Sequence, residues 1–174
     1  MSSSTHSTTA PSATASDPTP AECYGKTVSL FRMYSPSATD HFYTTDATER
    51  DRAVGSLGYT NEGTAAQVFS ACVYGAVPLY RLYSAGGTDH FYTTNAKERD
   101  HAVVALGYTN EGVAAYVYPG AKYGSVPLFR MYSASASDHF YTTDVDEKNR
   151  AVASLGYSDE GAVGYVYQVK VANC

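Results

Sequence analysis

The chain carries the same pattern of alternating apolar and polar residues three times. The copies are VSLFRMY at Val28–Tyr34, VPLYRLY at Val77–Tyr83 and VPLFRMY at Val126–Tyr132, which gives a period of 49 residues. Alternation with a period of two, in a stretch rich in β-branched and aromatic residues, is typical of a β-strand. Self-similarity at a fixed period indicates a repeat architecture, here with units 28–76, 77–125 and 126–174.

The residues after this strand predict a second strand, a helix and a third strand in each unit. The second strand is the sequence DHFYTT, at Asp40–Thr45, Asp89–Thr94 and Asp138–Thr143. A capping residue with a glutamate three positions later then marks the start of a helix. These capping pairs are Asp46 with Glu49, Asn95 with Glu98, and Asp144 with Glu147. The third strand is expected at Ala65–Phe69, Ala114–Tyr118 and Val163–Tyr167.

The predicted helix is short, about three turns long. In the first unit, Val54 and Leu57 are expected to form its apolar stripe. Gly58 stands where a left-handed C-terminal cap belongs, because glycine adopts a positive φ at no steric cost. Tyr59 is expected to fold back on the last turn, and a turn at residues 61–63 leads into the third strand.

A single β-β-α-β unit is too small to bury its own faces, since roughly 40 residues lies below the usual size of an independent core. The three units are therefore expected to share one core, as a ring or as a short stack. We favour the ring, an α+β fold of three β-β-α-β repeats in a closed pseudo-threefold arrangement. This single domain is expected at residues 22–174, after a disordered tail at residues 1–21 that is rich in Ser, Thr and Pro.

The cysteine positions favour the ring over the stack. Cys174 occupies the register of Ala76 and Ser125, the residues just before the next unit begins, and Cys23 lies just before the first unit. A closed ring makes these two positions neighbours, so we predict a Cys23–Cys174 disulfide with Cys72 left over. A Cys23–Cys72 bond and three free thiols are the alternatives.

Charge and composition narrow the choice of partners. The net charge is −5 and the basic residues are scattered, whereas nucleic-acid binding needs clustered Lys and Arg, so we expect no nucleic-acid partner. No apolar run approaches the roughly 18 residues of a membrane span. The chain begins without a signal-peptide pattern. The Ser/Thr/Pro-rich start is nevertheless common among O-glycosylated secreted proteins, and it favours an extracellular location over a cytoplasmic one.

The unit PLYRLY–short loop–DHFYTT–(D/N)AxER–LGYTNEGVAAYV resembles an uncharacterised repeat family of small fungal proteins and of the ends of bacterial cell-wall hydrolases. The resemblance extends over nearly all of residues 28–174. Repeats attached to enzymes that cut glycans imply binding of carbohydrate or cell-wall polysaccharide rather than catalysis. Because no hydrolase accompanies the repeats here, the resemblance implies a free-standing binder.

Catalysis and metal binding are weaker interpretations of DHFYTT. Asp40 and His41 are neighbours on a strand and point to opposite faces, which hinders a catalytic Asp–His pair. No serine or cysteine nucleophile recurs in a suitable motif. Nothing in the spacing demands that His41, His90 and His139 converge on a zinc ion. We therefore expect no catalysis, no metal site and no cofactor. A structural alternative is that the aspartates cap the hairpin turns.

Strand alternation assigns the hairpin residues to two faces. One face is expected to form core, with Phe31, Met33 and Phe42. The other face is expected to carry Arg32, Tyr34, His41 and Tyr43 outward. Aromatic rings pack on the C–H patches of a sugar, and charged groups fix its hydroxyls. The alternative is that the tyrosines bury their rings between units. The predicted ligand-binding residues are Arg32, Asp40, His41, Tyr43, Glu62, Arg81, Asp89, His90, Tyr92, Glu111, Arg130, Asp138, His139, Tyr141 and Glu160.

The sequence therefore predicts a multivalent lectin with one shallow site in each repeat. Three weak sites on one molecule suit surfaces with repeated glycans, because linked sites raise avidity. A secreted protein-binding or defence protein, acting through the variable hairpin loops, is the alternative from another class.

Overall fold

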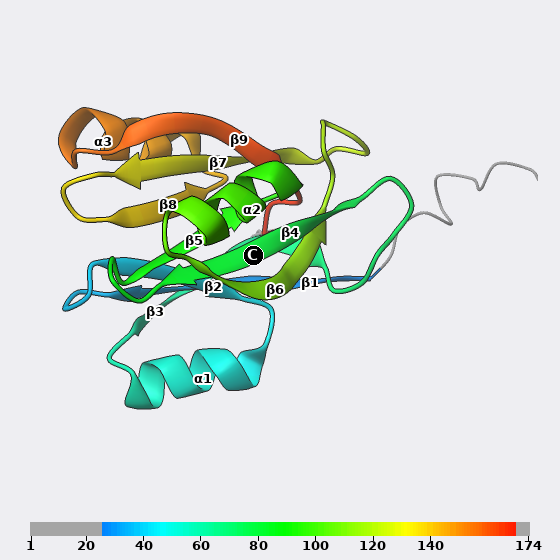
Figure 1. Ribbon diagram of the computed structural model, residues 1–174. Coiled ribbons are helices and arrows are strands. Elements are labelled where there is room, and N and C mark those ends of the chain that lie inside the picture. The colour runs from blue at the N-terminus through cyan, green and yellow to red at the C-terminus, as the bar shows by residue number, and fades with distance from the viewer. Residues whose placement is uncertain (1–25, 170–174) are drawn as a thin grey trace, which may run out of the picture.

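The computed structural model describes residues 26–169, in which one order of elements recurs three times (Figure 1). The first segment contains β1 (Thr27–Ser35), β2 (Asp40–Thr44), α1 (Ala47–Ser56) and β3 (Thr60–Phe69). The second contains β4 (Val77–Ser84), β5 (Asp89–Thr93), α2 (Ala96–Ala105) and β6 (Thr109–Val117). The third contains β7 (Val126–Ser133), β8 (Asp138–Thr142), α3 (Val145–Ser154) and β9 (Ser158–Val166).

The fold is α+β, with two sheets and three short helices. The larger sheet has the strand order β2-β1-β3-β6-β4-β5, and the smaller has the order β8-β7-β9. In each segment the first strand pairs antiparallel with the second, which forms the hairpin expected from the sequence. It also pairs antiparallel with the third strand. Two isolated bridges join the third segment to the other two. Tyr165 in β9 pairs with Tyr118, just after β6, and Tyr167, just after β9, pairs with Gln67 in β3.

Each helix lies against the strands of its own segment (Figure 1). A small local core fills the space between them. In the first segment, Met33, Phe42 and Ala53 are buried, with Phe31 packed against them. The prediction that the apolar hairpin residues form core is thus confirmed. The predicted helix stripe is wrong, since Val54 is 41% and Leu57 55% exposed. Alanine lets the helix lie close to the strands, so its larger apolar residues remain at the surface.

The helix ends follow the sequence prediction with one change. Asp46 accepts hydrogen bonds from the backbone N–H groups of Thr48 and Glu49, which confirms the N-cap. Glu49 does not return to the amide of Asp46. Instead, the Thr44 hydroxyl accepts from that amide at 3.0 Å and donates to Glu49 at 2.5 Å. Gly58 has φ +78°, as expected for a C-terminal cap.

A second, larger core lies where the three hairpins meet. It is formed by the side chains Leu30, Tyr43, Ala66, Val68, Leu79, Tyr92, Ala115, Val117, Leu128, Tyr141 and Val166. Strand β2 is therefore buried on both faces, with Phe42 toward the helix and Tyr43 toward the shared core. The expectation that Tyr43, Tyr92 and Tyr141 point outward is wrong, because each is 1% exposed. Period-two alternation predicts one polar face only when a strand has a single buried side.

The third strand begins earlier than predicted. β3 already starts at Thr60, and the expected turn at residues 61–63 is a bulge within the strand. Gly63 has φ +93°, and its N–H donates to the side chain of Asn61 at 2.9 Å. The bulge fixes the position of Glu62 opposite β1.

Several predictions concern residues outside 26–169. The predicted tail and both partners of the predicted Cys23–Cys174 bond fall there. Cys72 is an exposed free thiol. A search of the described residues for a helix able to cross a membrane found none that is long and apolar enough.

Candidate functional site

Three pockets lie between neighbouring segments, and each combines residues predicted from the sequence with a helix of another segment. Site 1 encloses about 270 Å³ and is lined by Arg32, His41, Glu62, Phe140, Glu147, Arg150, Ala151, Leu155 and Tyr157. Site 2 encloses about 240 Å³ and is lined by Phe42, Glu49, Arg52, Ala53, Leu57, Tyr59, Arg81, His90 and Glu111. Site 3 encloses about 300 Å³ and is lined by Phe91, Glu98, His101, Ala102, Leu106, Tyr108, Arg130, Tyr132, His139 and Glu160.

The predicted arginine, histidine and glutamate do come together in each site. In site 1 the Nε of Arg32 lies 2.9 Å from a carboxylate oxygen of Glu62, and His41 Nε2 lies 4.0 Å from the same oxygen. The equivalent distances from Arg81 and His90 to Glu111 are 2.8 and 4.0 Å. The structure therefore places the outward residues of the hairpin beside the bulge of the third strand.

A glutamate from the neighbouring helix completes each group. The two terminal nitrogens of Arg32 donate to the two oxygens of Glu147 at 3.0 and 3.1 Å, although the residues are 115 positions apart. Such bidentate pairs are stronger and more directional than single contacts. The same pairs join Arg81 with Glu49 and Arg130 with Glu98. From the sequence these glutamates are expected only as part of the helix caps, so their place in the sites was not predicted, although they recur at the repeat period.

These contacts determine the charge of the glutamates. Burial raises the pKa of Glu147, but hydrogen bonds from Arg32 and Thr142 outweigh it, and the net pKa is lowered. Glu49 and Glu98 have lowered pKa values for the same reasons. All three glutamates are therefore ionised at neutral pH, and each is paired with one arginine.

Each histidine is held by an aspartate from another segment. The Nδ1 atom of His41 lies 2.7 Å from Asp138, whose other oxygen accepts from the His41 backbone N–H at 2.9 Å. The ring also packs between Tyr34 and Phe140, with centroids 4.5 and 4.8 Å away. Asp40 holds His90 and Asp89 holds His139 in the same way. Adjacency within DHFYTT indeed prevents an Asp40–His41 pair, but pairing across segments was missed.

This arrangement orients the imidazole toward the pocket. Because Nδ1 donates to a carboxylate, Nε2 is left as the acceptor in the neutral ring. In the described part of the chain, no hydrogen bond engages Nε2 of His41, and its neighbour Glu62 is beyond hydrogen-bond distance at 4.0 Å. The site thus presents an imidazole nitrogen and a partly exposed carboxylate side by side.

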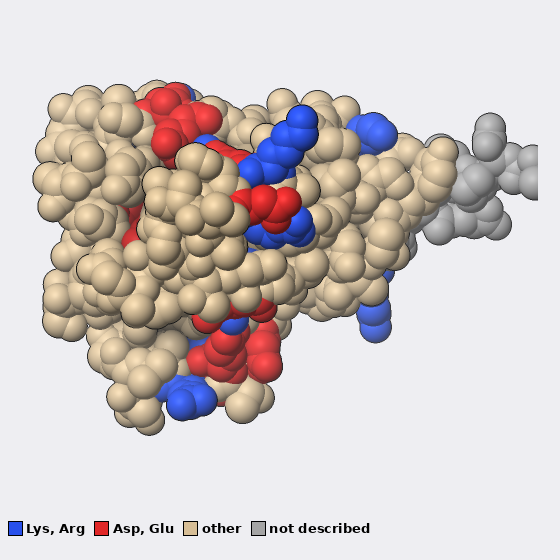
Figure 2. Space-filling view, in the orientation of Figure 1, with Lys and Arg blue, Asp and Glu red and all other residues tan. Residues whose placement is uncertain are grey.

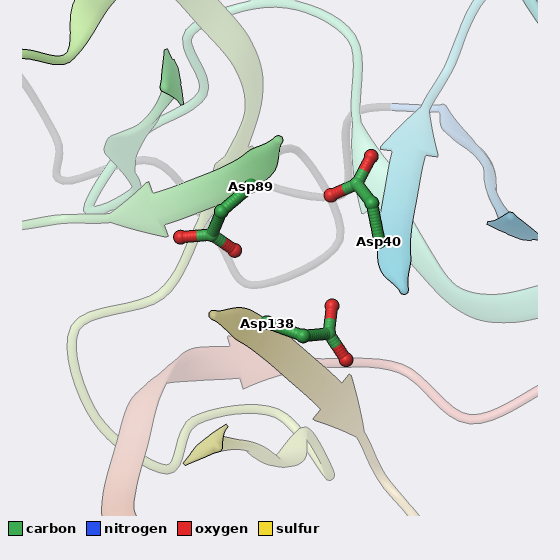
Figure 3. Close-up of side chains that lie close together, drawn as sticks. All are labelled: Asp40, Asp89 and Asp138. Carbon is green, nitrogen blue, oxygen red and sulfur yellow. The ribbon is translucent and has the colours of Figure 1, made fainter. Parts of the chain in front are cut away.

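The three aspartates themselves converge in the interior (Figure 3). Asp40, Asp89 and Asp138 are at most 1% exposed, and an oxygen of each lies within 4.8 Å of the others. Carboxylates in such a group are able to hold a metal ion. Here, however, every carboxylate already accepts from a backbone N–H, an imidazole and a tyrosine hydroxyl; for Asp40, Tyr59 donates at 2.5 Å. These bonds offset the cost of burying the charge and give the aspartates a structural task.

The tyrosines at the end of each helix belong to the same network. Burial and the hydrogen bond to Asp40 both raise the pKa of Tyr59, and Tyr108 and Tyr157 are raised by the equivalent contacts. Their hydroxyls consequently stay protonated and keep donating to the aspartates. The sequence predicts that Tyr59 folds back on the last turn of the helix, and its N–H donates to the carbonyl of Ala53 in that helix at 3.3 Å. Its ring lies beside that of Phe42, with centroids 5.8 Å apart.

The predicted tyrosines of DHFYTT lie away from the sites, in the shared core. The Tyr43 hydroxyl donates to the carbonyl of Tyr141 at 2.8 Å and accepts from its N–H at 2.9 Å. Tyr92 bonds the backbone of Tyr43, and Tyr141 that of Tyr92, in the same way. The alternative that tyrosine rings are buried between units thus describes these three residues.

The charged side chains form close-set groups on the face shown in Figure 2. Acidic and basic residues lie next to one another there, and no separate basic face is visible. This distribution agrees with the ion pairs of the three sites. It offers no continuous positive surface on this face for a phosphate backbone to follow.

Comparison with known proteins places the chain in a family. A family model described as a domain of unknown function (DUF5648) matches residues 29–167. The chain belongs to this family. No curated protein and no solved structure matches the chain. The DUF5648 match spans all three segments, from β1 to the residue after β9, so its boundaries are those of the described fold. The family description assigns no function to the three sites of this DUF5648 domain.

Proposed function

We propose that this chain is a multivalent carbohydrate-binding protein without catalytic activity, with one shallow site at each junction between segments. The observation that carries the proposal is the group of arginine, histidine and two glutamates beside aromatic and leucine side chains, found in all three pockets. The ligands are glycans or cell-wall polysaccharides, and the protein acts outside the cell.

The proposal includes a closed, pseudo-threefold arrangement of three repeats. Its support is the order in which contacts pass between segments. His41 in the first segment bonds Asp138 in the third, His139 bonds Asp89 in the second, and His90 bonds Asp40 in the first. A linear stack would leave two ends without partners, whereas this series of contacts returns to its starting segment. The bidentate arginine pairs follow the same order.

The chemistry of the sites fits a polyhydroxylated ligand. Sugar hydroxyls are hydrogen-bond donors, and each site offers acceptors for them in the imidazole Nε2 and the partly exposed glutamate oxygens. The apolar part of site 1 comes from Phe140, Leu155 and Tyr157. Volumes between 240 and 300 Å³ lie at or just below the low end of ligand pockets, which is about 300 Å³, and suit a small part of a ligand.

The ligand groups are also pre-organised. The arginine is held by two glutamates and the histidine by a buried aspartate, so little side-chain freedom is lost when a sugar binds. Shallow sites of this size bind weakly one at a time. Three on one molecule gain avidity on a surface that repeats the same glycan, because the second and third contacts are intramolecular. The resemblance to repeats that accompany cell-wall hydrolases supports the same ligand class.

The test is a glycan array followed by titration of the best glycan with single-site variants. Glu62→Gln, Glu111→Gln and Glu160→Gln each alter one site while the bidentate pair of the arginine is kept. For a glycan that all three sites accept, each should weaken binding at one site and leave the other two unchanged. Asp51→Asn is the matched control, since this exposed carboxylate pairs with Arg50 and lines none of the sites. Absence of binding to any glycan refutes the proposal, and binding to a protein partner through the hairpin loops would replace it.

A further inference from the structure

The three sites differ at one helix position that faces the pocket. Site 1 has Arg150 there and site 2 has Arg52, whereas site 3 has His101. These residues are 49 positions apart in sequence, so they occupy the same place in each helix. All three are exposed.

The two arginines have no protein partner in the described part of the chain. The arginines that do form ion pairs there are Arg32, Arg50, Arg81, Arg99 and Arg130. Arg52 and Arg150 have no carboxylate within ion-pair distance, although both line pockets that contain two glutamates. Their guanidinium groups are therefore available to a ligand.

The position also sets the charge of each site. In site 1, Arg32 and Arg150 face Glu62 and Glu147, which balances the charges. Site 2 is balanced in the same way. In site 3, Arg130 alone faces Glu98 and Glu160, and His101 takes the place of the second arginine. An anionic ligand group therefore meets an unpaired arginine in two sites, whereas the single arginine of the third site is already paired with both glutamates.

We propose that Arg52 and Arg150 select glycans that bear a carboxylate, such as uronic-acid residues, and that site 3 takes the uncharged counterparts. The inference rests on the proposed glycan binding and specifies its ligand class. The planar guanidinium matches a carboxylate in a bidentate manner, which an imidazole does not. Leu57, Leu106 and Leu155 line the equivalent edges of sites 2, 3 and 1, so the apolar part of the pocket stays the same while the charge changes.

The test compares uronic-acid oligosaccharides with their methyl esters, printed in pairs on one array. The ester keeps the shape of the sugar and removes only the charge. We expect about fivefold stronger binding of the acid than of the ester, which corresponds to the upper range of about 1 kcal/mol for an exposed ion pair. Sulfated sugars on the same array show whether a sulfate can replace the carboxylate.

Variants then assign the effect to the two arginines. In a titration with the best acidic oligosaccharide, the native chain should have two stronger sites and one weaker site. Arg52→Gln and Arg150→Gln should each weaken one of the stronger sites about fivefold, and His101→Arg should strengthen the third site by a similar factor. Lys97→Gln, on the same helix as His101 but outside the pocket lining, is the matched control. Equal binding of acids and esters at three sites would overturn this inference and leave glycan binding intact. Absence of binding to any glycan would overturn both.

Discussion

Removing the hydroxyl of one of the three buried core tyrosines, Tyr43, Tyr92 and Tyr141, should destabilise the protein far more than the loss of a single hydrogen bond. The change is Tyr92→Phe. The Tyr92 hydroxyl accepts from the N–H of Tyr43 at 2.8 Å and donates to the carbonyl of the same residue at 2.7 Å. It therefore satisfies both backbone groups of Tyr43 on the edge of β2 that faces away from β1.

The magnitude follows from what is left behind. The phenyl ring still fills its place, with its centroid 5.6 Å from Tyr43 and 5.4 Å from Tyr141, so packing is retained. One buried N–H and one buried carbonyl lose their partner, and each unsatisfied buried group costs about 1–3 kcal/mol. We expect a loss of about 2–6 kcal/mol. Typical domains have about 5–15 kcal/mol in total, so the loss is a large part of the stability.

The assay is equilibrium unfolding in urea, followed by tyrosine fluorescence and far-ultraviolet circular dichroism. Tyr74→Phe is the control, because Tyr74 is 69% exposed, and it should change the free energy of unfolding by less than about 0.5 kcal/mol. A loss for Tyr92→Phe no larger than that of the control would refute the inference that the buried tyrosine hydroxyls hold neighbouring segments together.

Two further predictions concern pH. Glu49, Glu98 and Glu147 have pKa values below their ordinary 4.5, so their stabilising contribution is complete above that value and is lost as the pH falls through the lower folded-state pKa. Urea unfolding in the acid range should show this loss, and Glu49→Gln should make it shallower. At alkaline pH the stability should instead fall as the pH rises. The reason is that burial raises the pKa of the core tyrosines Tyr43, Tyr92 and Tyr141 above their ordinary 10.0. The stability that these tyrosines contribute is complete below pH 10.0 and falls above it. The three buried tyrosines should therefore ionise together as the protein unfolds, and the absorbance of their tyrosinate form should rise in one cooperative step. A smooth titration of all tyrosines in the folded protein would contradict this.

The sequence predicted the elements whose causes are local. The hairpin follows from strand alternation, the helix start from Asp46, and the helix end from Gly58, and all of these involve neighbours along the chain. The apolar cluster of Phe31, Met33 and Phe42 was predicted for the same reason. Strand boundaries were less accurate, since the bulge at Gly63 reads as a turn from sequence alone.

The sequence failed where a residue's partner belongs to another segment. Glu147 satisfies the capping pattern of its own helix, yet it binds Arg32 at a separation of 115 positions. Asp138 lies next to one histidine and binds another, 97 positions away. Tyr43 has the polar hydroxyl expected of an outward residue, but this hydroxyl donates a hydrogen bond to the backbone carbonyl of Tyr141 in the shared core. In each case the residue fits a pattern formed with its neighbours along the chain. Its second interaction, with another segment, depends on how the segments pack and could not be predicted from that pattern.

The contacts that join neighbouring segments also build the candidate sites, and this bears on how the proposed binding would arise. A single segment contains Arg32, His41 and Glu62 but lacks both the glutamate that clamps the arginine and the aspartate that orients the histidine. Such a segment is also too small to bury its hairpin on both faces. Under the proposed function, a binding-competent site therefore forms only when segments associate, and the number of sites equals the number of junctions. With three segments, a linear chain has two junctions and a closed one has three, so a measured stoichiometry of three ligands for a glycan that all sites accept requires closure as well as binding.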